Sequence, residues 1–507
     1  MIYISLIFLI FILVPKVLVF FTIFQQNGYN PKKYYLNLKK HYLYTLSTYL
    51  EYISLIMLIS YYINYNWYLM VLEIFFILGS FMLSKQLVLA PVLTKRMVRL
   101  FITFCIICII PYIFFNKHIL IFTLETVLIP IIILIANYII LPLEQQIKRY
   151  YYQKTKNKLN KYQMINIGIT GSFGKTSTKN FLYHLLKEQY YTYKTPKSYN
   201  TPMGISKAVN RELPILSDVF IVEMGACNIG DINELVDLVN IDIGVITEIG
   251  PQHLETFKTI DNVLKTKLEI LNSKNLKTLI INQDNIYLRN TIYPNNLKII
   301  RIGINEEADY MAKNIIMKET YLSFDLYYQN NILTNIKTKL LGQHNIYNLL
   351  SAIVVAYSMG VDIENIKNSC FKIEPVLHRL STLQDGNIKI IDDAFNSNIV
   401  GFKNAVDVLK LADTNKIVIT PGIVDGGEYL KELNIDAAKK LTEVDFVLLV
   451  DNQASKYIQD YFDECAFTNY QVVKSFKQAY NIVQKESKSK DITLLIENDL
   501  PDNYLRR

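Results

Sequence analysis

The pattern of hydrophobic and polar positions changes near residue 145 of this 507-residue chain. Before that point, long apolar runs are separated by short polar segments. Each run is close to or longer than the roughly 17 residues that cross the hydrocarbon core of a bilayer as a helix. The runs cover residues 2–24, 46–64, 67–84, 99–115 and 119–142. The pattern therefore predicts an α-helical membrane region of about five spans in residues 1–145.

Basic residues between the runs predict the orientation of this region. They gather at 25–45, at 85–98 and in the charged segment 146–161, whereas the other loops are short. Loops rich in Lys and Arg face the cytoplasm in membrane proteins. We therefore expect a multi-pass protein of the cell membrane, with its N-terminus outside, membrane lipid around the spans and residues 146–507 in the cytoplasm.

After residue 161 the apolar segments become short and alternate with helical patterns. This alternation predicts α/β domains with mostly parallel sheets. We expect a basic linker at 146–161, a central domain at 162–378 and a smaller, Rossmann-like C-terminal domain at 379–507. The expected strands are 164–169, 219–223, 243–247 and 278–282 in the central domain, and 388–392, 417–420, 446–450 and 492–496 in the C-terminal domain.

The charge distribution follows the same division. Residues 1–150 hold 12 Lys and Arg against 4 Asp and Glu, a balance of 12 − 4 = +8, which is the net charge of the whole chain. The remaining residues hold 41 of each sign. A neutral α/β part excludes a nucleic-acid-binding protein with a basic face there. The 51% hydrophobic content excludes intrinsic disorder, and the five scattered cysteines do not predict a disulfide framework.

A glycine-containing loop follows the first strand of the central domain. It reads Thr170-Gly171-Ser172-Phe173-Gly174-Lys175-Thr176-Ser177 and leads into a helical pattern. Strand, glycine loop and helix are the context of a phosphate-binding loop, because backbone N–H groups and the helix N-terminus attract phosphate. The alternative is an ordinary glycine turn. We expect an ATPase domain in which the loop binds nucleotide through Gly171, Ser172, Gly174, Lys175, Thr176 and Ser177.

Polar residues stand at the ends of the next strands. Glu223, His253 and Asn282 each follow an apolar segment. Ligands of open α/β sheets bind at the carboxyl ends of the strands. Carboxylate and hydroxyl oxygens suit Mg²⁺, so Glu223 and Thr176 are candidate metal ligands.

Eight motifs in order resemble those of the Mur ligases, the ATP-dependent amide ligases of peptidoglycan synthesis. The resemblance covers about residues 162–507, and the last motif is typical of the branch that adds D-alanyl-D-alanine to UDP-N-acetylmuramoyl-tripeptide, MurF. The motifs are Thr170–Ser177, Glu223–Ala226, Thr247–Leu254, Lys267–Ile270, Ile281–Asp284, Gly342–Asn348, His378–Leu380 and Asp392–Asn398.

The resemblance implies a reaction and a set of roles. A substrate carboxylate attacks the γ-phosphate of ATP and becomes an acyl phosphate, which an amine then attacks. Lys175, Lys267 and His253 would be catalytic, Thr176 and Glu223 would hold one Mg²⁺, and His253 with carbamylated Lys267 would hold a second. Other implied nucleotide contacts are Asn282, His344 and Asn345 at the adenine and Arg379 and Asp393 from the C-terminal domain; Asn200 and Thr201 would face the acceptor substrate.

Three departures from the family concern its substrates. A membrane region stands where the family has its UDP-sugar domain, so a lipid-linked acceptor becomes an alternative. The C-terminal Lys-Gly-Ser-Arg pattern is replaced by a segment that begins Glu497-Asn498-Asp499, which could mean a different amine. Glu248 stands where the family has Asn.

We therefore expect a membrane-anchored amide ligase of the Mur type. Its partners would be a peptidoglycan precursor or another carboxylate acceptor and an amine, which is an amino acid or a dipeptide; nucleic acid is not expected. The alternatives are a nucleotide-driven transporter or flippase, a folylpolyglutamate- or cyanophycin-type ligase, and an inactive relative that binds nucleotide and scaffolds other enzymes.

Overall fold

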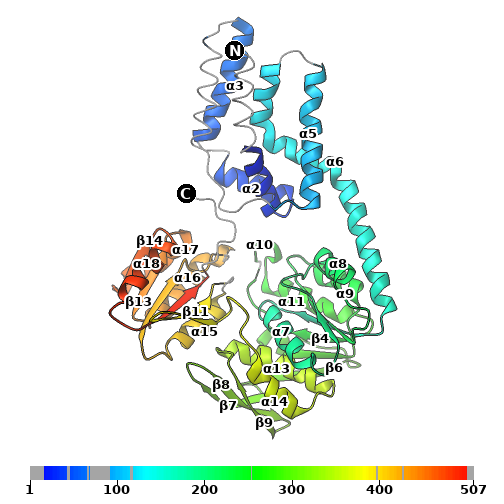
Figure 1. Cartoon of the computed structure of the whole chain (residues 1–507), viewed down its shortest axis with the longest axis vertical. Helices are drawn as coiled ribbons and strands as arrows, with labels where there is room; N and C mark the ends of the chain where they lie inside the picture. Colours follow the sequence, from blue (N-terminus) through cyan, green and yellow to red (C-terminus); the bar gives the residue numbers. More distant parts are fainter. Residues whose placement is uncertain are drawn as a thin grey trace. The chain divides into compact units, whose positions relative to one another are not determined.

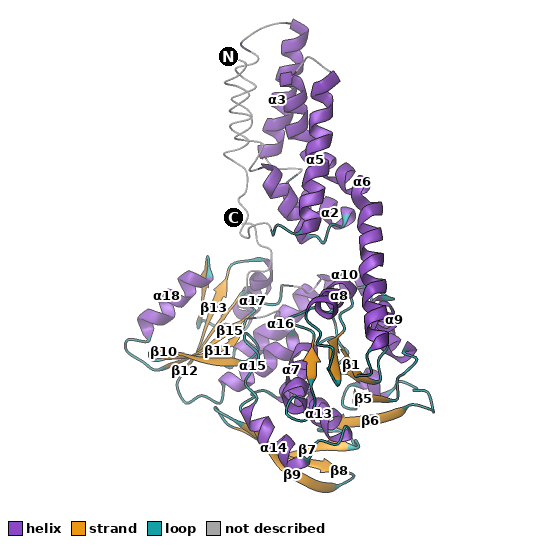
Figure 2. Cartoon of the chain, turned by 45° about the vertical axis from the view of Figure 1, so that its right-hand side comes forward, coloured by secondary structure: helices purple, strands orange, loops and turns teal. Residues whose placement is uncertain are grey.

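The chain divides into two compact units, residues 1–150 with 501–507 and residues 151–500 (Figure 1). The computed structural model describes residues 16–42, 46–64, 68, 92–114, 118–252, 254–394, 398–424 and 427–498. The first unit is helical, and the second contains two sheets with helices around them (Figure 2).

Within the described residues, the first unit consists of four apolar helices and one short basic helix. The apolar helices are Lys16–Gln26, α3 (Leu46–Asn64), α5 (Lys95–Phe114) and the greater part of α6 (His118–Lys161), and the basic helix is α2 (Pro31–His41). Phe24, Leu100 and Ile133 are fully buried in a core that Lys16–Gln26, α2, α5 and α6 share. A bidentate ion pair joins α5 to α6, because Arg99 donates to both carboxylate oxygens of Glu144 at 2.6 and 2.9 Å.

The expectation of about five membrane spans is not supported by these helices. Of the residues that the structure describes, one helix, Leu124–Lys161, is long and apolar enough to cross a membrane. Helices α3 and α5 coincide closely with the expected runs 46–64 and 99–115. The expected span 67–84 lies outside the described residues except for residue 68. The run 2–24 is described only from Lys16 onward, where the structure has the apolar helix Lys16–Gln26.

Helix α6 continues through the segment that was expected to be a linker. Its last turns belong to the second unit, where Leu159 is buried in the core. The Tyr152 hydroxyl donates to the Glu234 carbonyl oxygen at 3.0 Å, and the Lys158 ammonium donates to the carbonyl oxygens of Val209 and Leu213. The end of α6 is therefore a packed part of the central domain.

The central domain is built on a nine-stranded sheet in the order β2-β3-β1-β4-β5-β6-β7-β8-β9. Strands β2 to β7 pair in parallel, and β7, β8 and β9 pair antiparallel at one edge. The strands are β1 (Ile165–Thr170), β2 (Thr192–Lys194), β3 (Val219–Glu223), β4 (Ile243–Ile246), β5 (Thr278–Asn282), β6 (Lys298–Gly303), β7 (Tyr310–Met317), β8 (Leu322–Tyr328) and β9 (Asn331–Thr338).

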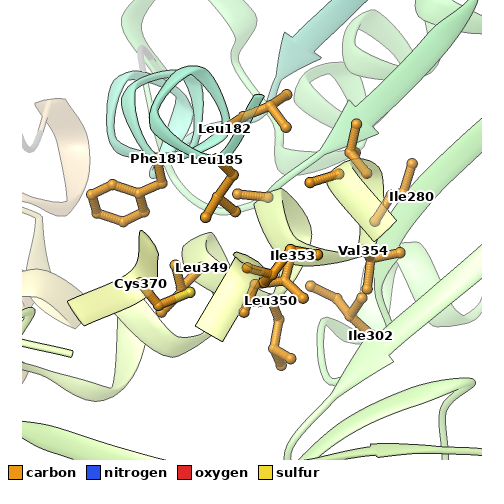
Figure 3. Close-up of a cluster of buried hydrophobic side chains, with 14 of the residues drawn as sticks. Phe181, Leu182, Leu185, Ile280, Ile302, Leu349, Leu350, Ile353, Val354 and Cys370 are labelled. Atoms are coloured by element: carbon orange, nitrogen blue, oxygen red, sulfur yellow. The ribbon is translucent and has the colours of Figure 1, made fainter. Parts of the chain in front are cut away.

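Helices cover both faces of this sheet because its central strands are apolar on both sides. In β3, Ile221 belongs to the core beneath α7 and α13, whereas Phe220 and Val222 belong to the opposite core. Figure 3 shows side chains of α7 and α13 converging on β5 and β6. The helices are α7 (Lys175–Leu186), α8 (Pro202–Arg211), α9 (Asp231–Val239), α10 (Leu254–Phe257), α11 (Ile260–Leu268), the 3₁₀ turn η1 (Glu269–Asn272), α12 (Ile286–Arg289), α13 (Gln343–Ser358) and α14 (Ile363–Lys372).

The C-terminal domain is a smaller α/β layer, as the alternation of strands and helices predicted. Its six-stranded sheet has the order β10-β11-β15-β12-β13-β14, parallel except for the antiparallel pair β10 and β11. The elements are β10 (Ser381–Asp385), β11 (Ile388–Asp393), α15 (Ile399–Leu409), β12 (Asn415–Thr420), η2 (Gly427–Tyr429), α16 (Leu430–Leu441), β13 (Phe446–Val450), α17 (Gln453–Glu464), β14 (Tyr470–Val473), α18 (Phe476–Glu486) and β15 (Ile492–Glu497).

Candidate active site

The loop between β1 and α7 requires glycine at two positions. Gly174 is the N-cap of α7 with a φ of 80°, and a Cβ there would lie 2.1 Å from Asn348 Oδ1. Gly171 has a φ of 143°, and a Cβ there would lie 2.1 Å from Thr247 Oγ1. Only glycine tolerates both the left-handed backbone and the close approach. The loop is therefore shaped for backbone N–H groups to face an anion at the start of α7.

Lys175 lies across this loop. Its ammonium group donates to the carbonyl oxygens of Gly171 at 2.7 Å and Ser172 at 2.9 Å. The pKa of Lys175 is lowered to about 8, mainly by burial; nearby Glu223 opposes the shift and Arg379 adds to it. Phosphate oxygens would satisfy this ammonium better than the two neutral carbonyl groups do.

Of the other predicted loop residues, two serines are held within the fold, whereas the Thr176 hydroxyl points to the end of β3. Ser172 is fully engaged in the fold, because its hydroxyl donates to the Gly250 carbonyl oxygen at 3.0 Å and accepts from the Gly250 N–H at 3.1 Å. Ser177 is buried in the first turn of α7. Thr176 instead directs its hydroxyl to the end of β3, where it donates to Glu223 Oε2 at 3.0 Å.

Glu223 is the centre of a buried polar cluster. Lys179 Nζ lies 2.8 Å from Glu223 Oε2, and Asn200 Nδ2 donates to Glu223 Oε1 at 3.1 Å. Burial by itself would raise the pKa of Glu223, but Lys179, Lys175 and the Asn200 amide outweigh it, and the pKa is lowered. Glu223 is therefore a carboxylate, and with the Thr176 hydroxyl it forms a pair of hard oxygen ligands that fits Mg²⁺.

Lys267 is a buried lysine whose positive charge no hydrogen bond in the described part of the chain would compensate. It lies in the last turn of α11 with 1% of its surface exposed, and its amine has no hydrogen-bond partner in the described part of the chain. The pKa of Lys267 is lowered to about 7, mainly by burial and in part by the nearby charge of Lys175. A neutral buried amine is the form that reacts with CO₂, so the residue fits the implied carbamate. His253 lies outside the described residues.

The residues expected at the adenine lie at the start of α13 and the end of β5. Asn345 Nδ2 donates to the Leu341 carbonyl oxygen at 2.7 Å, and Asn282 Oδ1 accepts from the Asp284 N–H at 3.1 Å. His344 Nδ1 is buried with no hydrogen-bond partner among the described residues. Burial and the Arg379 charge lower the pKa of His344 to about 4, so its imidazole is neutral and one ring nitrogen is available to a ligand.

Arg379 and Asp393, the two nucleotide contacts expected from the C-terminal domain, lie close together at its start. Arg379 lies between two non-glycine residues in the left-handed region, His378 with φ 61° and Leu380 with φ 49°. The turn is held at both sides, because His378 Nδ1 lies 2.7 Å from Asp392 Oδ2 and the Leu380 N–H donates to Asp393 Oδ1 at 3.1 Å. The charge of Arg379 acts on Lys175, Glu223 and His344, so the structure brings it to the phosphate loop.

Lys179 was not singled out from the sequence, and it pairs with Glu223. Asn348, the last residue of the Gly342–Asn348 motif, accepts a hydrogen bond from the Thr178 hydroxyl of α7 at 3.3 Å. Glu497 lies opposite Asp393 in the parallel pairing of β15 with β11. Burial raises the pKa of Asp393 to about 6. Position i+3 after Thr176 was the one available signal for Lys179, since it shares that face of α7.

Comparison with known proteins shows what this chain is similar to. Residues 169–356 match the Mur ligase middle domain, so this part of the chain is similar to the Mur ligase family. Within that family its similarity is to the UDP-N-acetylmuramoyl-tripeptide–D-alanyl-D-alanine ligases. The Bacillus subtilis enzyme is 29% identical over 266 residues, covering 52% of this chain and 55% of the relative. The Escherichia coli enzyme is 26% identical over 336 residues, covering 64% and 74%.

Solved structures share the fold. MurF from Acinetobacter baumannii superposes with a TM-score of 0.63 at 22% identity, covering 69% of this chain and 77% of that chain. MurF from Thermotoga maritima, determined in complex with ADP, gives 0.62 at 22% identity and covers 69% and 80%. The chain spans 55% and 64% of the length of the first two curated relatives it matches.

Proposed function

We propose that the chain is an ATP-dependent, ADP-forming amide ligase that joins a carboxylate acceptor to an amine in peptidoglycan precursor synthesis or modification. The observation that carries the proposal is the contact between Thr176 and Glu223 beside Lys175, at the mouth of the phosphate loop. This arrangement places a metal-binding pair and a cation where the β- and γ-phosphates of ATP would lie. The named relatives supply the substrate class.

The reaction needs two displacements. The acceptor carboxylate oxygen attacks the γ-phosphorus of ATP, the bond to the β-phosphate oxygen breaks, and ADP leaves. The amine nitrogen then attacks the acyl carbon. The bond between that carbon and the phosphate oxygen breaks, inorganic phosphate leaves, and the amine loses a proton. Lys175 and Arg379 would neutralise the charge on the transferred phosphoryl group, and such positioned charges supply most of the catalysis in phosphoryl transfer.

Magnesium and a carbamate complete the proposed site. Thr176 and Glu223 would hold one Mg²⁺, which supplies charge neutralisation at the phosphates. The buried amine of Lys267 would react with CO₂, and the resulting anion with His253 would serve a second Mg²⁺. The unpartnered position and depressed pKa of Lys267 support this role, because a protonated lysine would repel a cation.

The acceptor side is proposed from Asn200 and Thr201. Asn200 reaches Glu223 through its amide, and Thr201 caps α8 by accepting from the Gly204 N–H at 3.3 Å. These residues therefore stand next to the proposed metal ligand, where an acceptor carboxylate would meet ATP. We expect membrane lipid near the first unit and propose a cell-membrane location with the catalytic part in the cytoplasm; Leu124–Lys161 is the helix that supports it.

Phosphate release by the purified full chain tests the ligase. We expect release to require ATP, Mg²⁺, a carboxylate acceptor of the UDP-N-acetylmuramoyl-tripeptide class or its lipid-linked form, and an amine such as D-alanyl-D-alanine. Mass spectrometry should detect the amide. Nucleotide hydrolysis that ignores both acceptor and amine would overturn the proposal, and hydrolysis coupled to lipid movement in proteoliposomes would favour a transporter instead.

A further inference from the structure

Lys179 is the one member of the Glu223 cluster to which the proposed reaction gives no role. It lies in α7, three residues after Thr176, with 1% of its surface exposed. Its ammonium group is 2.8 Å from Glu223 Oε2 and also donates to the Lys197 carbonyl oxygen at 2.5 Å. One buried cation thus joins three parts of the central domain, namely α7, the end of β3 and the segment 195–201.

The segment 195–201 is fastened to β3 at both of its ends. The Thr195 N–H donates to the Ile221 carbonyl oxygen at 3.0 Å, and the Thr195 hydroxyl accepts from the Glu223 N–H at 3.2 Å. At the other end, the Gly225 N–H donates to the Asn200 carbonyl oxygen at 2.9 Å. The middle of the segment bends at Lys197, whose φ of 47° is in the left-handed region. Lys179 holds the carbonyl group at that bend.

The segment ends at the residues that the proposed function gives to the acceptor. Asn200 donates to Glu223 Oε1, the oxygen that Lys179 does not contact. A Cβ on Gly225 would lie 2.7 Å from the Asn200 side chain, so this amide is closely confined. The two oxygens of Glu223 therefore connect the metal side, through Thr176, with the acceptor side, through Asn200.

We infer that Lys179 is a positioning residue that fixes the acceptor segment 195–201 to the carboxylate of the metal site. The inference rests on the proposed function for the identity of the acceptor, but its geometric part concerns nucleotide-free protein. Lys179 keeps Glu223 in one orientation and holds the Lys197 bend, so that Asn200 faces the γ-phosphate. Lysine suits this role because its ammonium group can donate in three directions at once.

Two substitutions and a matched control separate this role from simple stabilisation. Lys179→Gln keeps a donor and removes the charge, and Lys179→Arg keeps the charge and changes the shape. Lys187→Gln is the control, because Lys187 is exposed at the C-cap of the same helix. Hydrogen exchange of the full chain in detergent is measured with and without MgADP, together with the Kd for MgADP and the KM values for ATP and acceptor.

In Lys179→Gln we expect the hydrogen-exchange protection factors of residues 195–201 to fall at least tenfold. The protection factors of β1 and α13 should stay as in the wild type. The KM for the acceptor should rise at least tenfold, the Kd for MgADP should change less than threefold, and Lys179→Arg should restore part of both losses. The control should match the wild type. If Lys179→Gln does not fold, Lys179→Arg alone carries the test, with partial loss of protection confined to 195–201.

Uniform loss of protection across the central sheet, or an unchanged acceptor KM with lowered kcat, would overturn the inference, since either result assigns Lys179 to general stability or to the nucleotide. Exchange and MgADP binding need no turnover. A wild-type chain that never couples ATP to an acceptor would therefore defeat the proposed function, while the exchange pattern would still decide the role of Lys179.

Discussion

At the scale of single residues, the phosphate loop tolerates no side chain at Gly174. Gly174→Ala would add both a left-handed alanine and a contact of 2.1 Å with Asn348 Oδ1. We expect at least a tenfold loss of MgADP affinity and a decrease of about 1–3 kcal/mol in the free energy of unfolding. Calorimetric titration and chemical denaturation measure the two effects.

Gly360→Ala provides the matched control for that substitution. Gly360 has a φ of 90°, and a Cβ added there would meet no atom within 4 Å. The control variant therefore has the strained backbone conformation without a steric clash. Equal effects of the two variants on nucleotide binding would show that backbone strain, rather than the close approach at Asn348, explains the Gly174 result.

Lys267 should make the stability of the protein depend on pH. Its folded pKa of about 7 lies below its ordinary value of 10.5, so the folded state binds fewer protons than the unfolded state between these values. Stability should therefore rise with pH from about 7 to about 10.5, and the penalty for charging the buried amine should be complete below pH 7. Lys267→Met should remove this part of the slope in denaturation curves taken between pH 6.5 and 9.5.

The same residue has a catalytic prediction. Lys267→Ala should lose activity and recover part of it with added short-chain carboxylates, which replace the carbamate. A fully active Lys267→Ala enzyme without additives would remove this lysine from the mechanism, whatever its effect on stability.

The sequence predicted individual residues best where the backbone dictates them. Gly171, Gly174, Thr176 and Glu223 follow from a strand, a loop and a helix start, and the structure places all four at one edge of the sheet. Lys179 could not be recognised in this way, because a lysine in a helix is usually solvated. Its burial depends on Glu223, which is 44 residues away in the chain.

At the scale of secondary-structure elements, the end of α6 is part of the core of the central domain. Leu159→Ala should reduce the free energy of unfolding of the second unit by about 2–4 kcal/mol, because Leu159 is 4% exposed in the core with α8 and α9. Lys161→Ala, on an exposed position of the same turn, should change it by less than about 0.5 kcal/mol. Thermal and chemical unfolding of the full chain compare the two variants.

The pattern of apolar positions predicted eight strands, which match β1, β3, β4 and β5 in the central sheet and β11, β12, β13 and β15 in the C-terminal sheet. It missed β2, β6, β10 and β14 and the antiparallel edge β7–β9. Alternating strand and helix defines the parallel part, since each crossover needs a helix. The edge strands carry polar residues at alternate positions and no intervening helix, so they lack that signal. The expected linker 146–161 is helical because its tyrosines, Leu159 and lysines find partners on α8 and α9, which lie far along the chain.

At the scale of the whole molecule, the C-terminal domain contributes charge to a site that the central domain builds. MgATP should raise the melting temperature of the wild type. In Arg379→Gln the same ligand should give half of that rise or less. A tenfold weaker Kd corresponds to about 1.4 kcal/mol of lost stabilisation at saturating ligand. Lys431→Gln, exposed in the same domain, should keep the full rise. An unchanged rise in the Arg379 variant would place that guanidinium outside the nucleotide site.

The sequence predicted the two α/β domains because each has its own alternation of strands and helices. It could not predict how the C-terminal substrate end differs from the relatives. Loss of the Lys-Gly-Ser-Arg pattern was visible, but the pairing of Glu497 with Asp393 depends on the register of β15 against β11. Apolar runs alone do not fix the number of helices that cross a bilayer; of the described helices, Leu124–Lys161 is long and apolar enough to do so.

The proximity of Arg379 and Lys175 has a consequence for the order of binding. The charge of Arg379 lowers the pKa of Lys175, so the two cations repel each other across the domain boundary. The triphosphate is the polyanion that fits between them. ATP would then act as the counterion that draws the two domains together, so that the amine can find its place only after the nucleotide has bound.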